Sequence, residues 1–145
     1  MKAMVAGFFV LSLLLSASFA RANQEDRINE QNRHLEHWME TLSNNPLVLV
    51  RKNAAYFLGS LQDERAVQTL IKALGDRSAL VRKEVAIALG NLGSEEALRE
   101  LFAAKSIEVD RSVQREQERA IEKIKAHAEY QQQKKQRYLD LQDPS

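Results

Sequence analysis

The sequence predicts an all-α fold, a short α-solenoid of about three antiparallel helix pairs with an extended C-terminal helix. The main observation is a motif that occurs twice, 31 residues apart: the segment 50–61 reads VRKNAAYFLGSL and the segment 81–92 reads VRKEVAIALGNL. A third, degenerate copy, VQREQERAIEKI, occupies 113–124. Repetition at such a period is typical of stacked helical units, each of which buries its apolar face against its neighbours.

The stretches between the copies supply the partner helices. Apolar residues recur at helical spacing in the segments 63–74 and 94–104. Asp63 and Ser94 stand where a helix N-cap belongs, and acidic residues follow both of them. A similar apolar stripe predicts a first helix from about residue 26 to residue 42, which completes the first pair.

Two glycines recur at the same place in the motif. Gly59 and Gly90 suit the left-handed backbone conformation that ends many helices, so we expect each of them to stop its helix. In the third copy Glu122 replaces the glycine, and we expect the last helix to continue through the polar segment 131–137. A polar terminal helix of this kind is typical of the capping repeat of an array.

The pattern resembles the HEAT-repeat family, most closely the short HEAT-like repeats of phycobilin lyases, over about residues 26–125. The signatures of tetratricopeptide and ankyrin repeats, which have similar lengths, are absent. The resemblance implies a ladder between repeats, formed by an acidic residue in each turn and an arginine six positions later. Asp76 and Arg82 match that pattern, so the arginines of the motif are expected to be structural. Two copies depart from it and leave the continuity of the ladder open: Asn45 with Arg51, and Glu108 with Gln114.

The N-terminal sequence predicts export. Lys2 precedes an apolar segment at 4–15, and small residues at 18–22 offer a cleavage site, so residues 1–22 are expected to form a signal peptide. The repeat domain would then cover 23–130 and a polar extension 131–145. An uncleaved membrane anchor is the alternative, because the 18 residues from 3 to 20 are largely apolar and approach the length that spans a bilayer.

Charge and composition argue against a nucleic-acid partner. The chain has 21 basic and 20 acidic residues, and loss of Lys2 and Arg21 with the signal peptide leaves 19 basic residues against 20 acidic ones. Nucleic-acid binding proteins usually carry a clear basic excess. The chain has no cysteine, which excludes a disulfide framework and a thiol nucleophile. We expect the bacterial periplasm to be its compartment.

The sequence contains no catalytic motif more specific than its amino-acid composition would produce by chance. His34 and His37 lie three positions apart on the first predicted helix, where a metal ion could bridge them. The His-Glu-x-x-His and His-x-x-Glu-His motifs of zinc peptidases are absent, however, and so are the His-Glu dipeptides through which certain HEAT-like hydroxylases bind iron. We therefore predict that the protein is not an enzyme and has no cofactor and no metal site.

The second helix of each pair carries the predicted partner-binding surface. If Val81, Val85 and Leu89 face the core, the adjoining stripe is exposed, and in solenoids this row commonly lines the concave groove. Tyr56 and Ile87 can anchor a bound peptide, although packing against the neighbouring repeat is the alternative interpretation. The predicted site consists of Asn53, Tyr56, Ser60, Glu84, Ile87, Asn91, Glu116, Arg119 and Lys123.

The sequence therefore predicts an exported scaffold that binds a protein or peptide through the groove. The family resemblance implies one alternative, an auxiliary subunit of a lyase or chaperone-like assembly. A membrane-tethered scaffold that retains its N-terminal segment is the other. The C-terminal helix is a second candidate surface, because eight basic residues and four acidic ones lie between 111 and 137, although such mixed charge is often only a solvated face.

Overall fold

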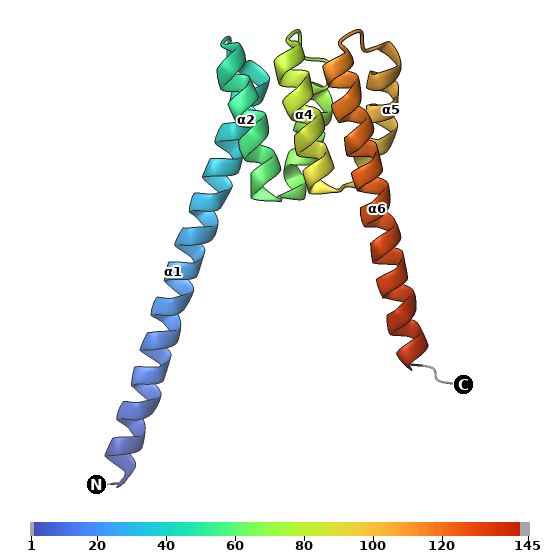
Figure 1. Ribbon diagram of the computed structural model, residues 1–145. Helices are drawn as coiled ribbons and strands as arrows, with labels where there is room; N and C mark the ends of the chain where they lie inside the picture. Colours follow the sequence, from blue (N-terminus) through green and yellow to red (C-terminus); the bar gives the residue numbers. More distant parts are fainter. Residues whose placement is uncertain (1, 143–145) are drawn as a thin grey trace. The chain divides into compact units, whose positions relative to one another are not determined.

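A computed structural model describes the backbone of residues 2–142 and the side chains of residues 21–142. Over this range the chain is helical without strands, which confirms the predicted all-α fold (Figure 1). The elements in chain order are α1 (Lys2–Asn44), α2 (Val48–Leu61), a 3-10 turn (Glu64–Ala66), α3 (Val67–Ala73), α4 (Ala79–Leu92), a second 3-10 turn (Glu95–Ala97), α5 (Leu98–Ile107) and α6 (Arg111–Gln142).

The chain divides into two compact units. The first, Met1–Glu36, contains the N-terminal part of α1, and its described side chains, from residue 21 onward, are mostly exposed. The second, His37–Ser145, contains the end of α1 and all the other helices. The predicted signal segment, residues 1–22, lies almost entirely outside the part of the chain whose side chains are described. Within residues 21–142, whose side chains are described, no helix has an apolar stretch long enough to cross a bilayer.

Helix α1 is longer than the predicted helix, which was expected to begin near residue 26. It begins at Lys2 and ends at Asn44, two residues before Pro46. The reason is that residues 8–45 contain neither glycine nor proline, so nothing in the sequence interrupts the helix before that proline.

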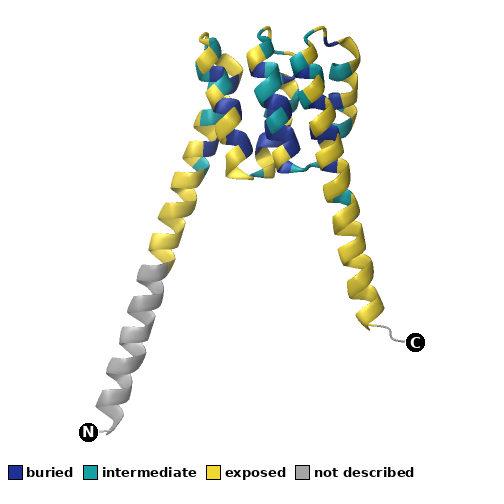
Figure 2. Cartoon of the chain, in the orientation of Figure 1, coloured by how far each residue is buried: buried dark blue, intermediate teal, exposed yellow. Residues whose placement is uncertain are grey.

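The repeats of the second unit pack side by side, so that α2, α4 and α6 form one row. Helix α4 packs against α2 on one side and α6 on the other, while α3 packs against α4 and α5 packs against α6. Figure 2 shows buried residues gathered along these contacts, most densely in α4. The motif places the same residue of each copy in this core: Leu58, Leu89 and Ile121 are all buried. The helix-pair architecture therefore follows from the repeated apolar stripe.

The prediction that Gly59 and Gly90 end their helices was wrong. Gly59 lies inside α2 and Gly90 lies inside α4. The residues with left-handed backbone at the two helix ends are instead Gln62, with φ of 55°, and Gly93, with φ of 69°. Each helix therefore ends two residues after the repeated glycine, and the left-handed capping residue follows at the third position.

The repeated glycines allow neighbouring helices to approach closely. A Cβ atom added to Gly59 would lie 2.7 Å from the Cα atom of Ala88, and one added to Gly90 would lie 3.0 Å from the Cα atom of Ala120. Any larger residue would therefore push α2 away from α4, or α4 away from α6. Glu122 occupies the same position in α6 and is exposed, because no later helix of the described chain packs there.

The predicted helix caps were half right. Asp63 caps the turn before α3, where its carboxylate accepts a hydrogen bond from the backbone N–H of Arg65 at 3.0 Å. Ser94 stands at the equivalent position before α5 with an extended backbone, but its side chain makes no capping hydrogen bond. The second cap therefore adds little to the stability of α5.

Gly59→Ala should destabilise the array, because the new methyl group would lie 2.7 Å from both the Cα and Cβ atoms of Ala88. Overpacking of this kind typically costs about 1–3 kcal/mol. Gly75→Ala is the matched control, since its Cβ atom would meet nothing closer than a backbone oxygen 3.8 Å away. Urea denaturation followed by circular dichroism measures both. Equal stability of the two variants would contradict the role of Gly59 in close helix packing.

Candidate partner-binding surface

A ladder of ion pairs connects successive repeats at the turns between the helices of each pair. The guanidinium group of Arg51 donates to both carboxylate oxygens of Asp76, at 2.8 and 2.9 Å. The guanidinium group of Arg82 donates to both oxygens of Glu108, at 2.7 and 2.8 Å. In each pair the arginine comes from one repeat and the carboxylate comes from the turn of the next. The ladder is therefore continuous across the three repeats.

The departures from the motif fall at the two ends of this ladder. Asn45 precedes the first arginine and needs no charge, since no earlier repeat supplies an arginine to it; its side-chain oxygen accepts from the N–H of Leu47 at 3.0 Å. Gln114 stands in the last repeat, where no following turn supplies a carboxylate. It donates to the backbone oxygen of Glu108 at 2.5 Å, as Arg82 donates to the backbone oxygen of Asp76 at 2.9 Å. Asn45 and Gln114 therefore differ from the motif because each stands at one end of the ladder, where one partner of the ion pair is not needed.

The ladder keeps Glu108 ionised. Hydrogen bonds from Arg82 lower the pKa of the Glu108 carboxyl group, burial opposes this, and hydrogen bonds from the backbone N–H groups of Asp110 and Val109 lower the pKa further. The net pKa lies below the ordinary value of 4.5. The charged pair is therefore the stable form of this contact at neutral pH.

Asp76 is also held in its charged form. Burial raises the pKa of its carboxyl group, but hydrogen bonds from Arg51 and from the N–H of Ser78 lower it, as do the positive charges of Arg51 and Arg77. The combined effect is a lowered pKa. Because both oxygens of Asp76 are already engaged by Arg51, this carboxylate is occupied as a structural group.

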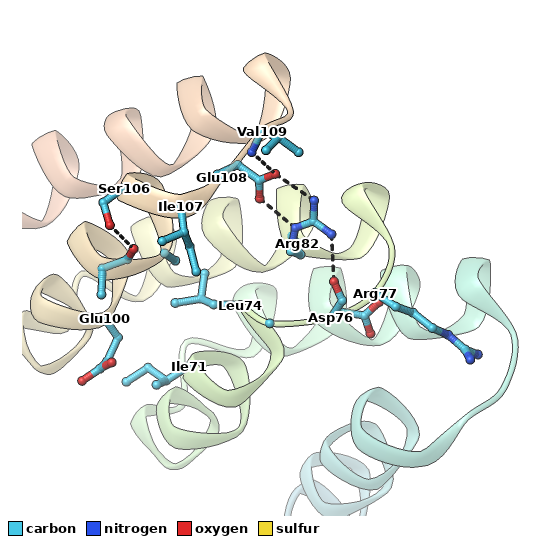
Figure 3. A pocket seen from close by; sticks show the side chains of 13 residues that line it. Ile71, Leu74, Asp76, Arg77, Arg82, Glu100, Ser106, Ile107, Glu108 and Val109 are labelled. Atoms are coloured by element: carbon cyan, nitrogen blue, oxygen red, sulfur yellow. Dashed lines mark hydrogen bonds and ion pairs between the residues drawn. The ribbon is translucent and has the colours of Figure 1, made fainter.

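An open pocket of about 720 Å³ lies beside the ladder, between the C-terminal ends of α3 and α5. Figure 3 shows Ile71, Leu74 and Ile107 on its apolar side and the Arg82–Glu108 pair on its polar side. Helix α3 has 7 residues and α5 has 10, so α5 continues past the end of its neighbour and leaves this space. The acidic side chains of the pocket already have cationic partners: Glu108 pairs with Arg82, Asp76 with Arg51 and Glu100 with Arg99. This leaves little polar recognition for a ligand.

The nine residues predicted to bind a partner lie on another surface, formed by α2, α4 and α6. None of them lines the pocket beside the ladder. Glu84, Ile87 and Glu116 are half-buried, and the other six are exposed: Asn53, Tyr56, Ser60, Asn91, Arg119 and Lys123. The structure therefore brings all nine together on adjacent helices, and it leaves the exposed members available for contact.

The sequence analysis missed residues on the same surface. Leu49 and Leu80 are 65% and 55% exposed and lie one helical turn before Asn53 and Glu84. Their spacing of i, i+4 and i+7 with the predicted residues is the signal that could have identified them. A basic residue also recurs at one position of all three copies: Lys52, Lys83 and Arg115. We define the α2–α4–α6 face as these five residues together with the nine predicted ones.

Tyr56 is an exposed aromatic residue that packing holds in place. Its side chain is 57% exposed, and its ring meets the ring of Phe57 edge to face with centroids 5.6 Å apart. Phe57 in turn stacks on Trp38 of α1, with centroids 4.5 Å apart. An anchor that is already ordered loses less conformational entropy when a partner binds. The aromatic cluster therefore suits Tyr56 for recognition.

The polar residues of the face are largely paired with each other. Lys52 lies 3.8 Å from the carboxylate of Glu84, and Arg119 lies 2.8 Å from that of Glu116. The ammonium group of Lys123 donates to the side-chain oxygen of Asn91 at 2.9 Å. The Lys52–Glu84 pair joins α2 to α4 and the Lys123–Asn91 hydrogen bond joins α6 to α4, whereas the Arg119–Glu116 pair lies within α6. The two contacts between helices help to fix the arrangement of side chains across the face.

The two histidines are not members of the α2–α4–α6 face. His34 and His37 are exposed on α1, and His37 contacts the edge of Trp38. The described residues contain no group of three or more metal-binding side chains.

Glu108→Gln should lower the free energy of unfolding at pH 7 by about 2 kcal/mol, since hydrogen bonds to charged groups contribute about 1.5–3 kcal/mol. The folded-state pKa of Glu108 is lowered, so its contribution is complete above the ordinary value of 4.5 and is lost as the pH falls through the folded-state value. The difference between wild type and variant should therefore shrink below pH 4.5. Denaturation from pH 7 to pH 2.5 measures it.

The matched control for this experiment is Glu100→Gln, which removes an ion pair with the exposed residue Arg99. Exposed pairs contribute little, so this variant should stay within about 1 kcal/mol of wild type at every pH. A difference between Glu108→Gln and wild type that stayed constant from pH 7 to pH 2.5 would contradict a charged ladder.

The fold agrees with the comparison to known families. A family model described as HEAT repeats matches residues 35–122, a range that runs from the end of α1 into α6 and contains both ion pairs of the ladder. No curated protein shows significant similarity to the chain. Arrays of this kind use extended surfaces to bind other proteins. On the basis of a match over more than half of its length, the chain belongs to the HEAT-repeat family.

Proposed function

We propose that this protein is an interaction scaffold that binds a protein partner through the α2–α4–α6 face, the surface that the sequence predicts to line the concave groove. One observation carries the proposal: Leu49, Tyr56 and Leu80 are each more than half exposed on two adjacent helices. Large apolar side chains that gather on one exposed face commonly mark a protein interface.

The register of the motif supports this choice. Leu49 and Leu80 occupy the same position of successive copies, and Tyr56 and Ile87 occupy another. Two such rows on neighbouring helices form a patch rather than scattered exposed residues, because packed helices lie only about 8–10 Å apart. Ile87 belongs to this patch and is half-buried, so it adds apolar area that a partner can cover.

Two other surfaces offer less for recognition. The acidic side chains of the pocket beside the ladder are already paired with arginines. The end of α6 exposes Tyr138, Leu139 and Leu141, but between them and the repeats lies a segment of exposed polar residues. Compared with these two surfaces, the proposed face combines ordered apolar anchors with charged residues held on packed helices.

We further propose that the protein acts outside the cytoplasm, with residues 1–22 as an export signal. The support is the basic residue, apolar segment and small residues of that N-terminal sequence. Mass spectrometry of the protein from its native envelope should find an N-terminus after Ala20 or Ala22. A membrane-bound chain that still contains residues 1–22 would overturn the cleaved export signal and indicate a membrane-tethered scaffold instead.

A photoreactive benzoylphenylalanine at Leu49 or Tyr56 should crosslink a partner protein in native cells, because both side chains project from the proposed face. The same group at Arg99 of α5, whose side chain is 91% exposed, is the matched control and should not capture that partner. Tyr56→Ala should then weaken binding of the purified partner by about fivefold or more, since interface aromatic residues often contribute more than 1 kcal/mol.

The double variant His34→Ala/His37→Ala should bind the same partner with unchanged affinity, because both residues lie outside the face. Calorimetry measures the affinity of the partner for the wild type, for Tyr56→Ala and for the double histidine variant, after each has been shown to be folded. Capture of the partner from Arg99 but from neither Leu49 nor Tyr56 would exclude the face as the binding site.

A further inference from the structure

The α2–α4–α6 face changes character from one side to the other. Its apolar residues are on α2 and α4, as Leu49 and Tyr56 on the first helix and Leu80 and Ile87 on the second. At the equivalent two positions, α6 has polar residues, Ser112 and Arg119. The N-terminal two-thirds of the face are therefore suited to apolar contact, and the C-terminal third is suited to polar contact.

The cations of the face show the opposite trend, because most of them lie on α6. Helices α2 and α4 each contribute one cation to the face, whereas α6 contributes three; the full set is Lys52, Lys83, Arg115, Arg119 and Lys123. The acidic residues of the face are Glu84 and Glu116. Five cations against two acids give the face a net charge of +3, although the whole chain carries only +1.

Both acidic residues of the face are already paired with cations of the face, and the remaining cations have no carboxylate partner. Glu84 is paired with Lys52, and Glu116 is paired with Arg119. Lys123 binds only the neutral side chain of Asn91. Lys83 and Arg115 form no hydrogen bond or ion pair with any residue in the described part of the chain, so three cations remain without a carboxylate partner.

We propose, on the basis of the function proposed above, that the partner presents an amphipathic acidic segment to this face. Large apolar residues of the segment lie on α2 and α4, and carboxylates lie against Lys83, Arg115 and Lys123. Charge complementarity selects this occupant, since the surplus cations attract acidic segments and repel basic ones. The segment crosses the row of helices, because the apolar residues lie on α2 and α4 whereas two of the three unpaired cations, Arg115 and Lys123, lie on α6.

The packing of the helices sets the length of this segment. Neighbouring helices lie about 8–10 Å apart, so α2 and α6 are separated by roughly 16–20 Å. An extended peptide rises about 3.3 Å per residue and crosses that distance with about five or six residues. The apolar and acidic residues of an extended partner are therefore about three to six positions apart.

A peptide selection tests the proposal with the full chain. A random library of 12-residue peptides is displayed on phage and selected on the immobilised protein, and the enriched sequences are synthesised with a fluorophore. The expected sequences contain large apolar residues at one end and at least two acidic residues at the other. Tyr56→Ala should weaken a synthetic peptide of this kind about fivefold. The charge reversal Lys83→Glu/Arg115→Glu should weaken it about tenfold or more, with the loss decreasing at high salt.

The matched control is Lys134→Glu/Lys135→Glu, which changes the net charge of the chain by the same amount at two exposed residues of α6 outside the face. It should leave the affinity unchanged. Circular dichroism and urea denaturation establish that all three variants are folded.

The outcomes separate the two proposals. Peptides that depend on Tyr56 but show no acidic preference, and that ignore the reversal at Lys83 and Arg115, would overturn the acidic partner and leave the face as the binding site. Peptides that depend on neither Tyr56 nor Lys83 and Arg115, or no enrichment at all, would overturn both proposals. Peptides weakened by the control at Lys134 and Lys135 alone would place recognition on the C-terminal helix. Binding of the chain to anionic phospholipid vesicles with the same sensitivity to both face variants, in the absence of acidic peptides, would replace the protein segment by a membrane surface.

Discussion

The stacking of this array depends on the direction of its ion pairs. Each arginine reaches from its own repeat to the carboxylate in the turn of the next, so Arg51 binds Asp76 and Arg82 binds Glu108. Bidentate contacts between arginine and carboxylate fix both distance and orientation. The pairs are mostly withdrawn from water, where breaking one would leave an uncompensated charge. Together with the close approach of the helices at Gly59 and Gly90, they hold α2, α4 and α6 in one fixed row.

The sequence predicted the helix pairs because apolar periodicity is a property of each segment alone. It did not reveal the pairing in the ladder, since Asn45 and Gln114 read as defects until the contacts show that they stand at the ends. The repeated glycines were misread for a related reason. A glycine near the end of a helix can permit a left-handed conformation or a close contact, and only the position of Ala88 on the next helix distinguishes the two.

Gln117, in the degenerate third copy, is a buried polar residue that the sequence pattern did not predict. It occupies the core position held by Ala54 and Val85 in the other copies and is fully buried. Its side-chain amide finds no hydrogen-bond partner in the described part of the protein, an arrangement that lowers stability. Periodicity identifies the position as core but does not indicate that a polar side chain will be buried there. The last repeat is therefore less stably built, although the last rung of the ladder and a long helix reinforce it.

The sequence predicted which repeated positions form the candidate site, but it did not include all the residues of the face. The motif placed Tyr56 and Ile87 at one position of successive copies, and the structure has them on the adjacent helices α2 and α4. The prediction did not include Leu49 and Leu80, because their positions fall before the most regular part of the repeat. All of these residues project from helices that the ladder and the glycine contacts hold in place. A partner that binds there has little of the protein to order, so its binding energy is reduced less by lost conformational freedom. The same rigid spacing fixes the distance between apolar and basic residues, and under the proposed function it would favour segments whose own residues have the matching separation.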